Sequence, residues 1–134
     1  MIELEFIARI LLSIALGALI GIEREKNHKP AGLRTHMLVC VGACLITVSV
    51  LNHFSPDSAA RIIANIVTGI GFLGAGSIIA SRQHVQGITT AASIWVVAGI
   101  GLVVGIGEYI LSIIVTVLVY LILEFVKFEK KLIG

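Results

Sequence analysis

The residues best suited to chemistry lie just after the first apolar stretch of the chain, in Glu23-Arg24-Glu25-Lys26. Glu23 directly follows Gly21-Ile22, so its carboxylate is expected at the boundary between lipid and water. Arg34 begins the next apolar stretch and is close enough in sequence to form an interfacial ion pair with Glu23. Such a pair can lock two helices together or form part of a binding site, and charged residues at membrane depth are rare and often functional. Glu23 and Arg34 are therefore candidate functional residues, and the alternative is that Glu23 to Lys26 form a solvated charged loop.

Glycines form a second group of candidates. Gly69-Ile70-Gly71-Phe72-Leu73-Gly74 matches the dinucleotide-binding pattern G-x-G-x-x-G letter for letter. That motif needs a preceding strand and an acidic residue about 20 positions later, whereas here no acidic residue follows until Glu108. We therefore predict close helix packing, in a dense core or a dimer interface, because small residues let two helix backbones approach. The glycines assigned to packing are Gly17, Gly21, Gly69, Gly71, Gly74, Gly76, Gly101 and Gly105. The alternative is that some of them break the third apolar stretch and expose backbone groups to a ligand.

Residue types that would indicate an enzyme or a metal centre are sparse. The sequence has no nucleophile–base pair and no zinc-type arrangement of His and Glu, so it predicts no enzymatic activity, no cofactor and no metal site. His28, His36 and His84 are expected in loops and are too scattered to indicate a metal site. Cys40 and Cys44 are expected to be small buried apolar residues. No run of Lys and Arg is long enough to suggest a nucleic-acid partner.

The elements that must position these residues are membrane-spanning helices. Apolar residues make up 57% of the chain and charged residues 13%, and the mean hydropathy is +1.06. Uncharged runs of 22, 20 and 25 residues separate Arg34 from Asp57, Arg61 from Arg82 and Arg82 from Glu108. About 20 apolar residues suffice to cross the hydrocarbon core. The chain is therefore predicted to be an all-α, polytopic membrane protein with a single transmembrane domain over residues 1–134. Its five spans are expected near residues 5–22, 35–52, 61–80, 88–106 and 109–126.

The basic residues predict an orientation. With five spans, eight Lys and Arg residues fall on one side of the membrane, against only Arg9 and Arg61 on the other. By the positive-inside rule the first side is cytoplasmic, which puts the N-terminus outside and the C-terminus in the cytoplasm. The eight residues are Arg24, Lys26, Lys29, Arg34, Arg82, Lys127, Lys130 and Lys131.

Threonines stand where two of these helices are expected to begin. Thr35 is expected to cap the second helix, and Gly87 with Thr89 or Thr90 to cap the fourth. Trp95 falls inside the fourth span, so its indole N–H is expected to need a buried acceptor.

Several of these stretches together resemble the MgtC/SapB family of membrane proteins. The matching segments are Gly17 to Glu25 with Pro30 to Thr35, the glycine-rich stretch Arg61 to Gly76, and Gly87 to Trp95. They stand in the order and spacing of that family, and the resemblance extends from about Ile10 to Ile106.

The resemblance implies a multi-pass protein of the bacterial inner (cytoplasmic) membrane, linked to growth at low magnesium and, in some pathogens, to survival inside macrophages. It also implies a regulator of other membrane proteins, with the F-type ATP synthase as a candidate partner, although the family was once proposed to transport magnesium. Carried over residue by residue, the functional candidates are Glu23, Arg24, Arg34, Thr35, Thr89, Thr90 and Trp95. The virulence-associated members often have Asn at the position of Thr89 and continue into a cytoplasmic regulatory domain. This chain ends at Gly134, so we expect a short form without that domain.

We therefore expect a non-enzymatic membrane protein that forms a homo-oligomer, with a dimer favoured, and modulates a partner when magnesium is limiting. The alternative is a transporter or channel for a divalent cation such as magnesium. Its outer carboxylates, Glu3, Glu5, Asp57 and Glu108, would capture the ion, and a broken glycine segment would form the path. A third possibility is a small membrane subunit whose role is assembly.

Overall fold

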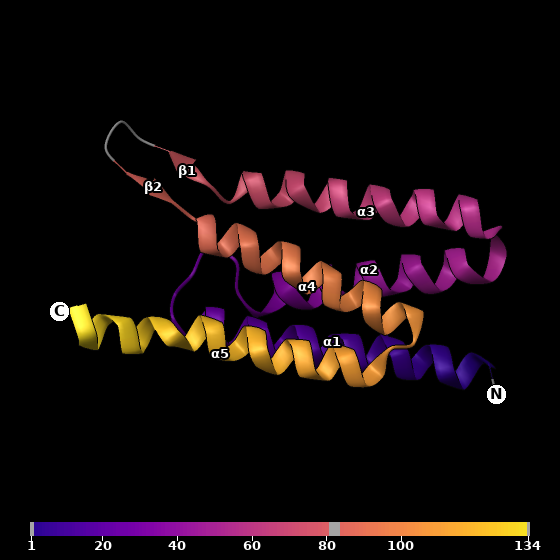
Figure 1. Cartoon of the computed structure of the whole chain (residues 1–134), viewed down its shortest axis with the longest axis horizontal. Helices are drawn as coiled ribbons and strands as arrows, with labels where there is room; N and C mark the ends of the chain where they lie inside the picture. Colours follow the sequence, from indigo (N-terminus) through magenta and orange to yellow (C-terminus); the bar gives the residue numbers. More distant parts are fainter. Residues whose placement is uncertain (1, 81–83, 134) are drawn as a thin grey trace.

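A computed structural model describes residues 2–80 and 84–133, and these residues form five helices and one short hairpin. The helices are α1 (Ile2–Lys26), α2 (Leu33–His53), α3 (Pro56–Gly76), α4 (Ile88–Ile106) and α5 (Tyr109–Ile133). Between α3 and α4, β1 (Ile79–Ala80) pairs antiparallel with β2 (Val85–Gln86). The helices run up and down beside one another, so that the two termini lie at opposite ends (Figure 1). The helical prediction is confirmed apart from the hairpin. Arg82, one of the basic residues used to predict orientation, lies outside the described residues.

Four helices, α1 to α4, are long and apolar enough to cross a membrane. The apolar part of α5, Tyr109–Phe125, is shorter, although the helix itself continues to Ile133. Large apolar side chains cover the outside of the bundle, as at Phe72, which is 82% exposed, and Ile110, which is 77% exposed. A surface of this kind suits lipid and not water, and the chain is therefore a membrane protein with several apolar helices. The fifth span and the orientation stay predictions.

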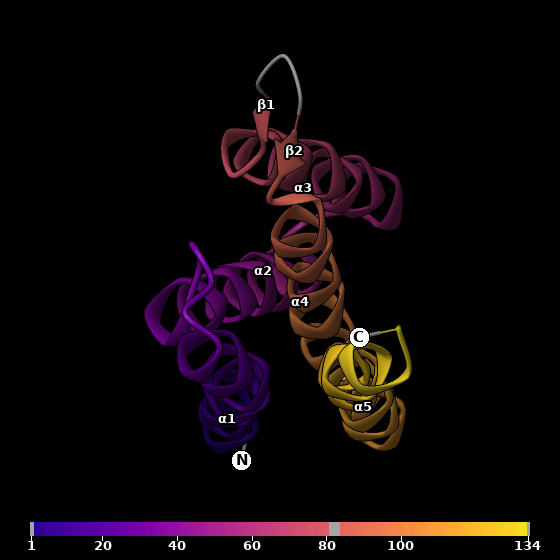
Figure 2. The same cartoon turned by 90° about the vertical axis from the view of Figure 1, so that its left-hand side faces the viewer.

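Helix α2 lies between α1 and α4 in the bundle, as the end-on view in Figure 2 shows. On the α1 side, a methyl group added to Gly17 would lie 2.8 Å from the carbonyl oxygen of His36. One added to Gly21 would lie 2.7 Å from Cα of Leu33. These two glycines therefore set the distance between α1 and α2.

Glycines also set the distance between α2 and α4. A methyl group at Gly101 would run into the carbonyl oxygen of Cys40, and one at Gly105 would lie 2.6 Å from Cβ of Thr47. The interior shared by the three helices is closed and mostly apolar, with Ile20, Cys40, Val97 and Val104 fully buried. The Thr47 hydroxyl is also fully buried, and it donates to the carbonyl oxygen of Ala43 in its own helix.

Helix α3 lies on the outer side of α4, and among its described residues only Ala59 and Gly74 are buried. A methyl group at Gly74 would meet Ala91 of α4 at 3.4 Å or more, whereas one at Gly69, Gly71 or Gly76 would meet nothing within 4 Å in the described part of the chain. Three of the four glycines assigned to packing on this helix are therefore not in close contact with another described helix.

The predicted alternative of a broken third helix is wrong, because α3 is continuous from Pro56 to Gly76. The prediction that this helix extends to residue 80 is also wrong. After Gly76, the Ser77 hydroxyl donates to the carbonyl oxygen of Gly74 at 2.7 Å, which uses an acceptor that a longer helix would need. Ile79 and Ala80 then pair with β2. Gly87 ends the hairpin with a φ of +91°, a backbone conformation that favours glycine.

The break expected between the fourth and fifth helices, at residues 107 and 108, is confirmed. Gly107 has a φ of +103° and its N–H donates to the carbonyl oxygens of Val103 and Val104 at the end of α4. A left-handed glycine in this position is a common way to end a helix, and Tyr109 begins α5 two residues later.

Candidate functional site

Most of the candidate residues come together at one end of the bundle. The end of α1, the start of α2 and the start of α4 meet there, beside the hairpin and at the end where the C-terminus lies (Figure 1). Turns after Lys26 and before Ile88 place three helix ends next to one another.

Glu23 and Arg24 form a buried ion pair at the end of α1. Their exposed fractions are 2% and 1%, and Arg24 Nη1 donates to Glu23 Oε2 at 3.2 Å. The second carboxylate oxygen of Glu23 accepts from the Asn27 side chain at 2.7 Å. Removing either charge would leave the other buried and unpaired, at a cost of about 3–5 kcal/mol. The structure pairs Glu23 with Arg24 and leaves Arg34 exposed.

The Arg24 guanidinium is not fully paired by this arrangement. Its Nε atom is buried and has no hydrogen-bond partner among the described residues. Buried donors in proteins are nearly always paired, so this N–H is the most unusual polar group at this end of the bundle.

The side chain that accepts a hydrogen bond from the start of α2 is Glu25, and not Thr35. A Glu25 carboxylate oxygen accepts from the backbone N–H of Leu33 at 2.8 Å, which places a negative charge at a helix N-terminus, where the helix dipole favours it. Gly32 is the N-cap residue, and a side chain there would overlap the Glu25 carboxylate. Thr35 is the third residue of the helix and is exposed, so the prediction that it caps α2 is wrong.

His36 ties α2 to α4. It is fully buried, with Nδ1 2.8 Å from the carbonyl oxygen of Gly32 and Nε2 2.9 Å from the Ser93 hydroxyl. Ser93 in turn donates to the carbonyl oxygen of Thr90 at 2.8 Å. The prediction that His36 lies in a loop is therefore wrong. The predicted second span, 35–52, already includes His36, but the sequence does not indicate that its side chain is buried against Ser93 of α4.

A cavity of about 450 Å³ lies between the α1–α2 connection and the start of α4. One side is formed by Arg24 and by the loop residues His28, Lys29 and Pro30. The other side is formed by the end of the hairpin and the first turn of α4, from Val85 to Thr90. Thr90 is buried and Thr89 is exposed at the cavity. Gly87 caps α4 without a side-chain hydrogen bond, so the prediction that a threonine caps this helix is wrong.

Four of the seven predicted functional residues do not border this cavity: Glu23, which is paired with Arg24, and three that lie elsewhere, Arg34, Thr35 and Trp95. Arg34 borders an apolar hollow with Ile14 and Met37, and Thr35 borders another with Leu73. Trp95 is 51% exposed, which contradicts the prediction that its indole N–H reaches a buried acceptor.

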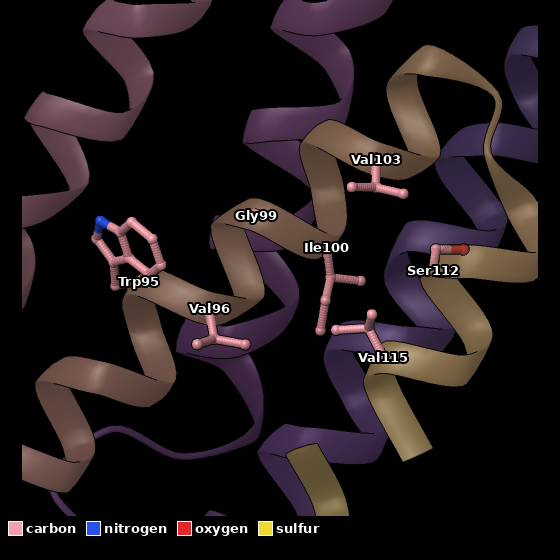
Figure 3. Close-up of a pocket in the computed structure, with 7 residues that line it drawn as sticks. All are labelled: Trp95, Val96, Gly99, Ile100, Val103, Ser112 and Val115. Carbon is pink, nitrogen blue, oxygen red and sulfur yellow. The ribbon is translucent and has the colours of Figure 1, made fainter. Parts of the chain in front are cut away.

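Trp95 instead lines an apolar hollow of about 270 Å³ between α4 and α5 (Figure 3). The indole lies at one end of the hollow, and Ser112 and Val115 of α5 lie at the other. Gly99 of α4 leaves this space unfilled, since a methyl group there would meet nothing within 4 Å. Sequence alone could not distinguish this lipid-facing position from a core position, because both are apolar in a membrane protein.

A second polar cluster, at the opposite end of the bundle, was missed by the sequence analysis. Arg9 donates to the Tyr109 hydroxyl at 3.0 Å, to the carbonyl oxygen of Gly105 at 2.6 Å and to Glu5 at 2.5 Å. It thereby joins α1 to the turn between α4 and α5. The spacing of Glu5 and Arg9 by four residues was the available signal, whereas nothing in the sequence indicated Tyr109.

A metal-binding arrangement does not occur in the part of the chain that the structure describes. Within residues 2–80 and 84–133, no three His, Cys, Asp or Glu side chains lie close enough together to hold a metal ion. The candidate site therefore offers hydrogen-bond donors from N–H groups, hydroxyl groups and basic side chains.

Comparison with known proteins assigns the chain to a family. The sequence profile of the MgtC family matches residues 10–132. The chain belongs to the MgtC family. A member from Escherichia coli K12, named putative magnesium transporter YhiD, is 47% identical over 130 residues, which cover 90% of this chain and 60% of that protein. Protein MgtC of Salmonella typhimurium LT2 is 44% identical over 119 residues, which cover 89% of this chain and 51% of that protein.

An uncharacterised protein of Haemophilus influenzae is 37% identical over 122 residues, which cover 84% of this chain and 51% of the relative. The chain thus spans between about half and three fifths of the length of these relatives. No solved structure matches it. The predicted family resemblance is confirmed, and the name of the Escherichia coli relative connects that protein with magnesium.

Proposed function

We propose that this chain is a non-enzymatic protein of the bacterial inner membrane that helps the cell adapt to low magnesium by modulating another membrane protein. Membership of the MgtC family and the name of the Escherichia coli relative support the connection with magnesium. In this proposal α5 is the fifth span, the N-terminus is outside and the C-terminus is in the cytoplasm.

The observation that supports modulation over conduction is the closed interior of the bundle. Glycines 17, 21, 101 and 105 bring α1 and α4 against α2 at backbone distance. The side chains between them, such as Ile20, Val97 and Val104, are fully buried and apolar. The buried hydroxyls of Ser13 and Thr47 already donate to carbonyl oxygens of their own helices. An ion crossing between these helices would therefore lose its hydration and gain few ligands, which is costly in a medium of low dielectric constant.

The exposed face of α3 supports a homo-oligomer, with a dimer favoured. Gly69, Gly71 and Gly76 have no neighbour within 4 Å of an added methyl group, so a second α3 helix could approach them closely. Cross-linking between single cysteines introduced at Gly69 should trap dimers in membranes, whereas a cysteine at Gly42 of α2 provides the matched negative control.

The proposal is tested by measuring magnesium flux into proteoliposomes that contain the purified protein, with empty vesicles as the baseline. We expect no saturable flux. Saturable flux that Glu23→Gln removes, and that the exposed Glu129→Gln leaves unchanged, would replace modulation by conduction. Correct insertion is verified beforehand by protease protection of the C-terminal end.

The partner is sought in the same membranes. The F-type ATP synthase is the first candidate, and the expected result is co-purification with this chain together with a changed rate of ATP hydrolysis. Co-purification at fixed stoichiometry without any change in that rate would instead favour the assembly role.

A divalent-cation transporter is the second candidate function, favoured by the name putative magnesium transporter given to the Escherichia coli relative. Because the interior of one copy is closed, its path would have to lie between copies, along the exposed face of α3. Gly71→Leu would fill such a path, so magnesium flux lost in this variant while the dimer persists would support the transporter.

A further inference from the structure

We propose that the cavity between the α1–α2 connection and the start of α4 binds an anion that carries a phosphate group. The inference goes beyond the proposed function and is independent of it, because such a site could serve a regulator or a transporter. Three sets of donors converge on the cavity, from Arg24, from Lys29 and from the first turn of α4.

The first argument is the incomplete pairing of Arg24. Its side chain is 1% exposed and borders the cavity, yet its Nε has no partner among the described residues. A guanidinium carries five N–H donors in a planar fork that matches the oxygens of a phosphate. Because the Arg24 side chain borders the cavity, an anion there would give the guanidinium an acceptor in addition to Glu23.

Glu23 does not take the place of that anion. One of its carboxylate oxygens accepts from Arg24 Nη1 at 3.2 Å, and the other accepts from Asn27 at 2.7 Å. Glu23 therefore compensates the Arg24 charge from one side and leaves the Nε unpaired.

The second argument is the start of α4. The helix begins at Ile88 after Gly87, and no side chain caps it. The first N–H groups of a helix have no partner within the helix, and the helix dipole places a partial positive charge there. Helix N-termini are for this reason common binding places for phosphate, and here Gly87, Ile88, Thr89 and Thr90 all border the cavity.

The third argument is the charge of the lining. Lys29 and His28 contribute basic groups from the loop, and no carboxylate is among the described residues that border the cavity. The nearby Glu25 is directed to the start of α2 instead, where it accepts from Leu33 at 2.8 Å. A cavity with this lining attracts an anion and disfavours a bare cation.

The volume fits the same class of ligand. The space of about 450 Å³ falls within the range of roughly 300–1,000 Å³ that is usual for small-molecule sites. Donors from three separate segments border the cavity, namely the end of α1, the loop after it and the start of α4, and a phosphate offers acceptor oxygens in several directions. The cavity lies at the end of apolar helices, so the phosphate could belong either to a lipid head group or to a soluble molecule.

The test uses the full chain in phosphatidylcholine nanodiscs. Inorganic phosphate is titrated by calorimetry at constant ionic strength, because exposed charges are sensitive to salt. In a second arm, the nanodiscs contain phosphatidylglycerol as well, and the lipid retained by the protein after detergent extraction is quantified.

Variants distinguish anion binding in the cavity from nonspecific attraction to exposed basic residues. Lys29→Glu reverses a charge that borders the cavity, whereas Lys26→Glu makes the same change at an exposed residue that does not border it. Thr89→Glu places a carboxylate at the start of α4, where it should stabilise the helix while occupying the anion's place. The double variant Glu23→Gln with Arg24→Gln removes the guanidinium without leaving an unpaired buried charge.

We expect saturable binding that Lys29→Glu and Thr89→Glu each weaken by at least about tenfold, or 1.4 kcal/mol, and that Lys26→Glu leaves unchanged. Binding of inorganic phosphate identifies a soluble ligand. Selective retention of phosphatidylglycerol, lost in the same variants, identifies a lipid head group. If the Glu23/Arg24 double variant does not fold, Lys29→Glu and Thr89→Glu still test whether the anion binds in this cavity. Absence of both forms of binding, or equal weakening by Lys29→Glu and Lys26→Glu, overturns the proposal.

Discussion

Replacing Gly21 by Ala should force α1 away from α2. The added methyl carbon would lie 2.7 Å from Cα, 2.9 Å from O and 3.2 Å from C of Leu33. Carbon atoms in favourable contact are about 3.5–4.0 Å apart, so the helices must separate locally by about 1 Å. All three contacted atoms belong to the backbone, and a rotamer change therefore cannot relieve the overlap.

The magnitude follows from two opposing effects. Overpacking of this kind costs about 1–3 kcal/mol, and the rigid neighbour places Gly21→Ala at the upper end. Alanine is favoured over glycine inside a helix by about 1 kcal/mol, which leaves a net loss of about 2 kcal/mol. Gly42→Ala is the matched control, because Gly42 also lies inside a helix and a methyl group there meets nothing within 4 Å. The control should gain about 1 kcal/mol, so the two variants should differ by about 3 kcal/mol.

The assay is reversible unfolding in mixed micelles, with helix content followed by circular dichroism as the fraction of denaturing detergent rises. Gly21→Ala should unfold at a lower fraction than the parent, and Gly42→Ala at an equal or higher one. Equal midpoints for the two variants would refute the argument that glycines fix the distance between α1 and α2.

Three further outcomes are expected. Arg9→Met should destabilise the bundle by about 2–4 kcal/mol in the same assay, since it removes hydrogen bonds to a hydroxyl, a carbonyl and a carboxylate. An unchanged unfolding midpoint would mean that these hydrogen bonds of Arg9 do not form in the membrane. His36→Phe and Ser93→Ala should each cost about 1–3 kcal/mol, and the double variant should cost less than their sum because the two side chains share one hydrogen bond; strict additivity would contradict that bond. Cys40 and Cys44 are fully buried, so a membrane-permeant maleimide should modify them only after unfolding, and rapid labelling of the folded protein would show that the interior is accessible.

The number of helices and some of the helix ends could be predicted because hydropathy and charge spacing act locally. The bounds of α4 and the start of α5 agree with the predicted spans, whereas α3 is displaced by four to five residues from its predicted span. The contrast between Gly17 and Gly71 shows the limit of such patterns. Both were assigned to packing, but Gly17 lies against the backbone of His36 whereas Gly71 meets nothing within 4 Å. The spacing of small residues indicates a close approach and does not identify the partner.

The candidate site could be predicted only in part. Arg24, Thr89 and Thr90 were selected from the sequence, and they border the same cavity. Lys29 was counted only as a charge, and the pairing of Glu23 with its neighbour Arg24 was not foreseen. These features depend on the path of the loop from residue 27 to residue 32, where His28 has a φ of +51°. Nothing in the residue pattern indicated that conformation.

The position of α2 between two glycine-bearing helices has a consequence for synthesis. Helices α1 and α2 are adjacent in the chain and can pair as soon as both have left the ribosome. The other side of α2 must wait for Gly101 and Gly105, which are made about 50 residues after α2 ends. At roughly 5–20 residues per second, that interval lasts several seconds. During this interval, the surface around Cys40 and Thr47 faces lipid, the insertion machinery or another nascent copy. The nascent chain is therefore most open to incorrect helix pairing at the surface of α2 that later packs against α4.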